Sequence, residues 1–138
     1  MKMVKFFSLL ILFVTCIYSC TKYDEGSNFS LISPRQRLIN NWMLTSYTEG
    51  PTDKTSTYYY FEVNLEKDGD LKRTWKDDNF ALTEFGNWDI SKDNKIVYLK
   101  KQDGQIEAYD IIQLKNKDLK VRQNANTIYE KTWTFHQR

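Results

Sequence analysis

From Trp42 onward, short runs of Tyr, Phe, Val, Ile, Thr and Trp recur about every ten to fifteen residues, and turn-forming pairs separate them. The clearest pairs are Asp68-Gly69, Asp93-Asn94 and Asp103-Gly104. Such pairs tolerate positive φ and suit tight hairpin turns. The pattern therefore predicts antiparallel strands over residues 42–48, 57–66, 71–76, 80–83, 85–91, 95–101, 106–114, 119–123 and 127–136.

The alternation within these runs predicts which side chains face the core, because successive side chains of a strand point to opposite faces. In the second run the expected core face holds Tyr59, Phe61, Val63 and Leu65, opposite Tyr58, Tyr60, Glu62, Asn64 and Glu66. In the last run it holds Tyr129, Lys131, Trp133 and Phe135. A cation among aromatic residues indicates either snorkelling at a barrel mouth or stacking on a ring.

The number of runs predicts the overall architecture. If residues 80–83 and 85–91 form one interrupted strand, the chain has eight strands. A single open sheet of that size would expose two edges, so we expect closure into an eight-stranded up-and-down antiparallel barrel of the all-β class. Ahead of it, Ser33, Pro34 and Gln36 form a capping-box pattern. This pattern predicts a short N-terminal helix reaching about Asn40.

The N-terminus has a different pattern: Lys2 and Lys5, an apolar run over residues 6–17, and a small residue, Ser19. This order is typical of a secretion signal, and the run is too short to span a bilayer as a helix. We therefore expect a signal peptide over residues 1–19, a flexible tether over 20–32 and one barrel domain over 33–138.

The residues at the end of the signal, Ile17, Tyr18, Ser19 and Cys20, resemble the lipobox of bacterial lipoproteins. The resemblance implies cleavage before Cys20 and acyl chains on it, which would anchor the domain to a membrane. An ordinary secretion signal with a leftover cysteine is the alternative. The following segment 21–25, a lysine ahead of acidic residues, resembles the export signal of Bacteroidetes surface lipoproteins. We expect an outer-membrane location, on the periplasmic face or the cell surface.

Removal of the signal changes the charge and the cysteine count. Without Lys2 and Lys5, basic residues equal the 18 acidic ones, so the mature chain is close to neutral. A neutral chain with charges of both signs interspersed offers no basic patch for nucleic acid. Cys16 leaves with the signal and Cys20 would carry lipid, so no thiol remains for a disulfide, thiol catalysis or zinc.

Several segments of the barrel region resemble the small lipocalin-like domains of Bacteroidetes lipoproteins, over about residues 34–136. The matching segments are 38–42, 61–69, 86–90, 109–114 and 119–121. The family usually has Gly-x-Trp at the first strand, whereas Asn40 stands at the glycine position here. The resemblance implies that Trp42 plugs the closed end of the barrel, with a late basic residue, Lys131 or Arg138, packed over it.

The resemblance also implies a cup that holds a small hydrophobic ligand. We expect the candidate binding residues on the inward face to be Tyr59, Phe61, Trp88, Tyr109, Tyr129 and Trp133. Physically, an eight-stranded barrel can hold one small ligand or be filled by its own side chains, and these bulky residues favour filling. The alternative is a surface module that recognises glycan or protein with exposed aromatic residues such as Tyr58 and Tyr60.

No residue pattern predicts catalysis or a metal site. His136, the single histidine, falls on an outward position near the C-terminus and has no second triad member. Asp77 and Asp78 are adjacent, so their carboxylates point apart. Asp68-Gly69 lacks the ligand spacing of a calcium loop. We therefore expect a non-enzymatic protein without cofactor or metal, whose partners are the membrane and either a small ligand or a surface glycan or protein.

Overall fold

A computed structural model of the chain describes Tyr23, residues 31–76 and residues 79–138. The predicted signal, Cys20 and nearly all of the tether lie outside the described residues, as do Asp77 and Asp78. Within the described part, no helix is long and apolar enough to cross a bilayer.

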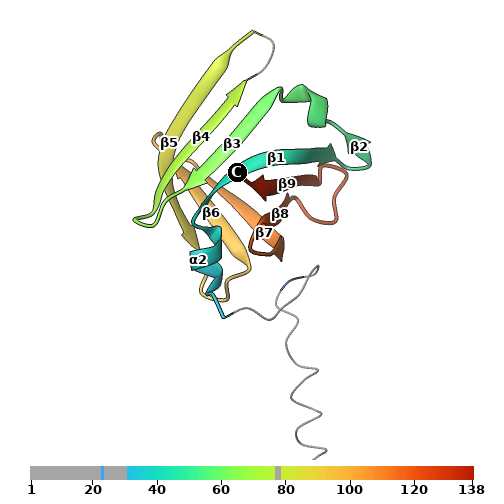
Figure 1. The fold of residues 1–138 in the computed structure, drawn as a ribbon. Helices are drawn as coiled ribbons and strands as arrows, with labels where there is room; N and C mark the ends of the chain where they lie inside the picture. Colours follow the sequence, from blue (N-terminus) through green and yellow to red (C-terminus); the bar gives the residue numbers. More distant parts are fainter. Residues whose placement is uncertain (1–22, 24–30, 77–78) are drawn as a thin grey trace, which may run out of the picture.

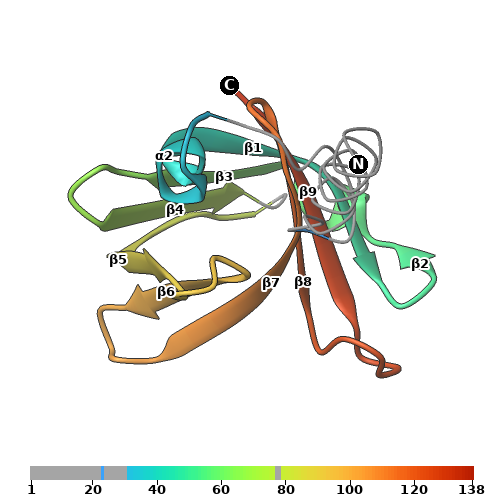
Figure 2. The ribbon, with the colours of Figure 1, turned by 90° about the horizontal axis from the view of Figure 1, so that it is seen from below.

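Eight strands form a closed antiparallel barrel, as the sequence predicts (Figures 1 and 2). Each strand pairs with the next along the chain, and β9 returns to β1. The strands are β1 (Asn40–Glu49), β3 (Tyr60–Leu65), β4 (Asp70–Lys76), β5 (Ala81–Ile90), β6 (Ile96–Lys101), β7 (Ile106–Leu114), β8 (Asp118–Gln123) and β9 (Lys131–Gln137). The two-residue β2 (Thr52–Asp53) adds to the end of β1, and a 3-10 turn, η1 (Thr55–Thr57), follows it.

The predicted boundaries differ from the observed ones mainly at strand starts. The runs 80–83 and 85–91 are one continuous strand, β5. The second strand begins at Tyr60 instead of residue 57, since η1 occupies Thr55–Thr57. The last strand begins at Lys131, because Asn124 and Asn126 adopt positive φ and the chain turns again up to Glu130.

The short helix α2 (Pro34–Leu38) covers one end of the barrel (Figure 1). Its capping box is confirmed: the Ser33 hydroxyl accepts from the backbone of Gln36, and the Gln36 side chain accepts from the backbone of Ser33. The Trp42 indole donates to the Leu38 carbonyl (2.9 Å), and the buried Arg37 guanidinium donates to the Leu114 carbonyl. We call this the capped end and the opposite end the open end.

Because the strands alternate in direction, the topology assigns every connection to one end. The open end holds the connections that follow β1, β4, β6 and β8. The capped end holds the connections that follow β3, β5 and β7, such as the turn at Gly69, whose φ is +96°. The core lies along the whole interior and includes Trp42, Leu71 and Leu114, which are almost completely buried.

Candidate functional site

The barrel interior is nearly filled by its own side chains. The cavity within the barrel measures about 40 Å³, far below the roughly 300 Å³ at which ligand pockets begin. Its lining includes Trp42, Phe61, Tyr109, Trp133 and Phe135. An apolar ligand therefore finds no preformed space between these residues.

Aromatic rings fill the half of the interior nearer the open end. Trp133 stacks on Tyr47 with ring centroids 5.1 Å apart and meets Tyr109 edge-on at 5.2 Å. Tyr58 sits edge-on against both Tyr47 and Phe61. Edge-to-face and offset pairs of this kind add stability beyond their buried area. These five rings, which we call the aromatic cluster, therefore fill the open half of the interior.

Tyr58 was expected on the outward face, and here the alternation fails. It lies at the end of η1, before β3 begins, and its ring packs against the core. The two-residue period applies only within a strand, so positions ahead of Tyr60 do not follow it.

The six predicted ligand-binding residues separate into three groups. Phe61, Tyr109 and Trp133 line the small cavity. Trp88 is buried near the capped end, where its indole donates to the Glu66 carbonyl (2.8 Å) and the Arg35 guanidinium lies 4.7 Å from its ring centroid. The prediction that Tyr59 and Tyr129 point inward is wrong: they are 83% and 71% exposed, because both lie in connections just outside β3 and β9.

Trp42 is fully buried, and its indole is hydrogen-bonded to Leu38 of α2. It therefore lies where we expect a residue that closes the capped end. The late basic residues expected over it are engaged elsewhere. Lys131 lies 3.5 Å from Glu49 at the open end, and Arg138 lies 3.2 Å from Glu62. The cation at the capped end comes from α2 instead, since Arg35 stacks on Trp88 and pairs with Asp89.

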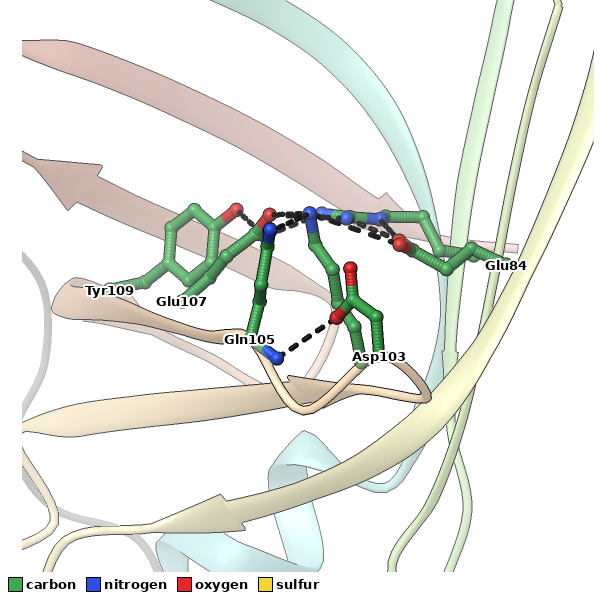
Figure 3. A network of polar contacts seen from close by, with 7 residues as sticks. Glu84, Asp103, Gln105, Glu107 and Tyr109 are labelled. Carbon is green, nitrogen blue, oxygen red and sulfur yellow. Dashed lines mark hydrogen bonds and ion pairs between the residues drawn. The ribbon is translucent and has the colours of Figure 1, made fainter.

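A network of charged side chains crosses the interior between β4 and β7 (Figure 3). Arg73 binds Glu84 through two nitrogens and Glu107 through Nη1 at 2.8 Å. The Nζ atom of Lys101 lies 2.8 Å from Glu107, and the Tyr109 hydroxyl donates to the same carboxylate at 2.7 Å. Two cations thus neutralise two carboxylates inside the barrel wall.

The pKa values of these groups follow from that geometry. Burial opposes ionisation of Glu107, but hydrogen bonds from Arg73, Lys101 and Tyr109 outweigh it and lower its pKa to about 2. Burial and the bond to Glu107 raise the pKa of Tyr109. At neutral pH Glu107 is therefore a weak base and Tyr109 stays protonated. Both states suit a structural network better than proton transfer.

The sequence reasoning missed this network, although a signal was present. Arg73 lies between Leu71 and Trp75 on the inward positions of β4, and Glu84 lies opposite it on β5. Residues of opposite charge at inward positions of neighbouring strands indicate an internal ion pair.

Apolar side chains gather around the open end. Six of the large exposed ones lie in its connections or at the first residues of its strands: Tyr59, Phe80, Leu82, Ile106, Ile128 and Tyr129. We call this set the open-end rim. Large exposed apolar groups concentrated at one end are typical of an interaction surface.

A cleft of about 340 Å³ opens beside the rim, between β5 and the β6–β7 hairpin. Its walls carry Trp75 and Leu82 together with Glu84, Lys101 and Asp103. Unlike the interior, this cleft is large enough to receive a group from a partner molecule. In the described part of the chain, no group of three or more His, Cys, Asp or Glu residues is placed to hold a metal ion.

Comparison with known proteins supports the fold. No family model matches the chain, and the search of curated proteins finds no match. Among solved structures, the chain is similar to a lipocalin-like protein from Bacteroides uniformis ATCC 8492, with a TM-score of 0.58 and 14% identity. The match covers 74% of this chain and 99% of the other. At this identity the likeness shows a lipocalin-like barrel fold.

Proposed function

We propose that the chain is a lipid-anchored, non-enzymatic binding module of the outer membrane, which recognises a surface glycan or protein with its open end. The observation that carries the proposal is the filled interior. Because the interior cavity measures only about 40 Å³, ligand binding inside the barrel requires displacement of packed aromatic rings, each of which contributes to stability.

The open-end rim supports the same proposal. Rings and aliphatic side chains that remain exposed in the folded monomer gain free energy when a partner removes them from water, about 25 cal/mol per Å² of apolar area. Tyr59 and Tyr129 also carry hydroxyl groups, so they suit surfaces that are partly polar, such as glycans and protein interfaces.

The anchor at Cys20 complements this arrangement. The tether joins the barrel at Ser33, which caps α2 at the capped end. A membrane-bound lipid on Cys20 would therefore hold the chain from the capped-end side and leave the open-end rim accessible.

A photocrosslinking experiment tests the recognition surface. A photoreactive phenylalanine analogue replaces Tyr59 or Tyr129 in the full chain, expressed in its host cells, and a matched control carries it at Leu31. Leu31 is more exposed than either tyrosine but precedes α2. We expect discrete crosslinked adducts from the two rim positions and none from position 31. Adducts of equal yield from all three positions contradict the proposal.

A titration tests the alternative of an internal hydrophobic ligand. The purified protein is titrated with the fluorescent fatty acid cis-parinaric acid. We expect no saturable binding at one molecule per barrel. Stoichiometric binding that quenches the fluorescence of the interior tryptophans would instead support small-ligand binding as the function.

A further inference from the structure

The first part of strand β5 is paired with a neighbouring strand on one side only. Residues 81–87 pair with β4, but pairing with β6 begins at Gly86 and continues to Ile90. In the described part of the chain, no strand therefore pairs with the β6-facing side of residues 81–85. Figure 1 shows β4 and β5 reaching the top of the view side by side, beyond β6.

The direction of the backbone groups follows from hydrogen bonds further along β5. The Trp88 N–H donates to the Gly69 carbonyl on the β4 side, and the Ser91 N–H donates to the Ile96 carbonyl on the β6 side. Backbone groups alternate sides along a strand, and the register is continuous from Ala81 to Ile90. The N–H and C=O groups of Ala81, Thr83 and Phe85 therefore point to the open edge.

Gly86 marks the point where β5 and β6 diverge. A Cβ at this position would lie 2.1 Å from the Lys100 carbonyl oxygen, so only glycine allows the two backbones to approach there. Beyond it, β6 ends at Lys101 and turns back into β7, whereas β5 continues. The cleft of about 340 Å³ lies along this divergence, with Leu82 and Phe85 in its lining.

The same kind of divergence occurs between β1 and β3, where the chain covers it with an extended segment of its own. There β1 pairs with β3 only over Asn40–Met43, and β2 then adds to the end of β1. The Lys54 N–H continues this pairing by donating to the Tyr47 carbonyl at 2.8 Å. Nothing comparable covers β5 among residues 31–76 and 79–138, and no Lys or Pro protects positions 81–85.

We propose that an extended peptide segment of a partner protein adds to β5 along Ala81–Phe85 as a further strand, with an apolar side chain in the adjacent cleft. This inference rests on the proposed surface-recognition function and names the partner as protein. Main-chain bonds to the edge would provide affinity, and the cleft would select the side chain. A second copy of the chain fits less well, because antiparallel self-pairing about Thr83 sets Leu82 against Glu84 of the other copy.

The test uses the full chain, purified in detergent, and peptides selected from a displayed library of random ten-residue sequences. Two variants form a matched pair. Thr83→Pro removes the outward N–H, which is tolerated at an edge. Thr83→Ala keeps this N–H but loses the same bond to the Thr74 hydroxyl. We expect fluorescence anisotropy to show affinity within about twofold of the parent for Thr83→Ala and at least tenfold weaker for Thr83→Pro.

A second measurement does not depend on folding of the proline variant. N-methylation of the best peptide, one residue at a time, should weaken binding at every second position, because only alternate N–H groups of an added strand face β5. Equal affinity of both Thr83 variants, a uniform N-methyl profile, or failure to select any peptide overturns the proposal. A dimer that Thr83→Pro dissociates, detected by light scattering, overturns it in favour of self-pairing.

The two proposals fail in distinguishable ways. Rim crosslinks to protein that persist in Thr83→Pro would retain the recognition surface and refute the strand addition. Crosslinks only to glycan would do the same. Loss of rim crosslinking altogether, together with cis-parinaric acid binding, would refute both.

Discussion

At the scale of single residues, several side chains of the barrel interior fill space and also have their polar atoms paired. Trp42 is fully buried, yet its indole N–H reaches the Leu38 carbonyl. Arg73 crosses the wall between two carboxylates. Buried polar groups of this kind stabilise a fold only when they are paired, so removal of one partner costs more than the bond itself.

Trp42 should be among the residues most costly to truncate. We expect Trp42→Ala to lower the free energy of unfolding by about 3–5 kcal/mol, because it leaves a large cavity beneath α2. Urea denaturation followed by circular dichroism measures the change. Tyr129→Ala, a truncation of an exposed ring, is the control and should cost less than about 0.5 kcal/mol. A loss below about 1 kcal/mol for Trp42→Ala would contradict its structural role.

The carboxylate of Glu107 should make stability depend on acid pH. Its pKa falls from 4.5 to about 2 in the folded chain, so its ionised form stabilises the fold above about pH 4.5. That stabilisation is lost as the pH falls from 4.5 towards 2. We expect Glu107→Gln to have a flatter profile over this range in urea unfolding between pH 7 and pH 2.5. Glu66→Gln, a change on the exposed surface, should keep the parent profile.

At the scale of elements, strand length decides where the barrel wall is continuous. β5 has ten residues and β6 has six, so part of β5 extends past its neighbour. β1 also has ten residues, and β2 covers its extension. Gly86 lies within β5 at the point where pairing with β6 begins.

Gly86 should therefore tolerate no side chain. A Cβ 2.1 Å from the Lys100 carbonyl meets rigid backbone, and we expect Gly86→Ala to lower the free energy of unfolding by more than about 2 kcal/mol. Gly104→Asn is the comparison, because nothing lies within 4 Å of a Cβ there and asparagine tolerates a positive φ, here +87°, better than most residues, so we expect a smaller loss. Thermal melting compares the two variants. Similar melting temperatures would show that β5 and β6 separate easily.

At the scale of the whole molecule, the barrel interior leaves almost no free space, and six of the large exposed apolar side chains lie at the open end. Truncation of a residue of the aromatic cluster should create free space in the interior. We expect Trp133→Ala to open the interior near Tyr47 and Tyr109 and to create binding of cis-parinaric acid that the parent lacks. Ile128→Ala, on the open-end rim, is the control. No binding by Trp133→Ala would indicate that the cluster collapses into the space.

The anchor is also tested on the whole molecule. Cys20→Ala should move the protein from the membrane fraction to the soluble fraction of its host cells, since acyl chains on this cysteine are the proposed attachment. Immunoblots of fractionated cells measure the distribution. Unchanged membrane retention would contradict lipidation of Cys20 as the attachment, whereas a parent protein already found in the soluble fraction would favour the ordinary secretion signal.

The sequence alone determined the all-β class, the eight strands and the capping box, because hydrophobic alternation, turn pairs and caps are encoded by residues close together in the chain. It also placed Phe61, Tyr109 and Trp133 inside correctly. It misplaced Tyr59 and Tyr129, since alternation does not show where a strand begins. Only the tertiary structure decided that the interior is filled, that Arg73 and Glu107 meet within it, and that β5 outruns β6. These features depend on register and on the relative lengths of strands that are distant in sequence, and local periodicity carries no information about either.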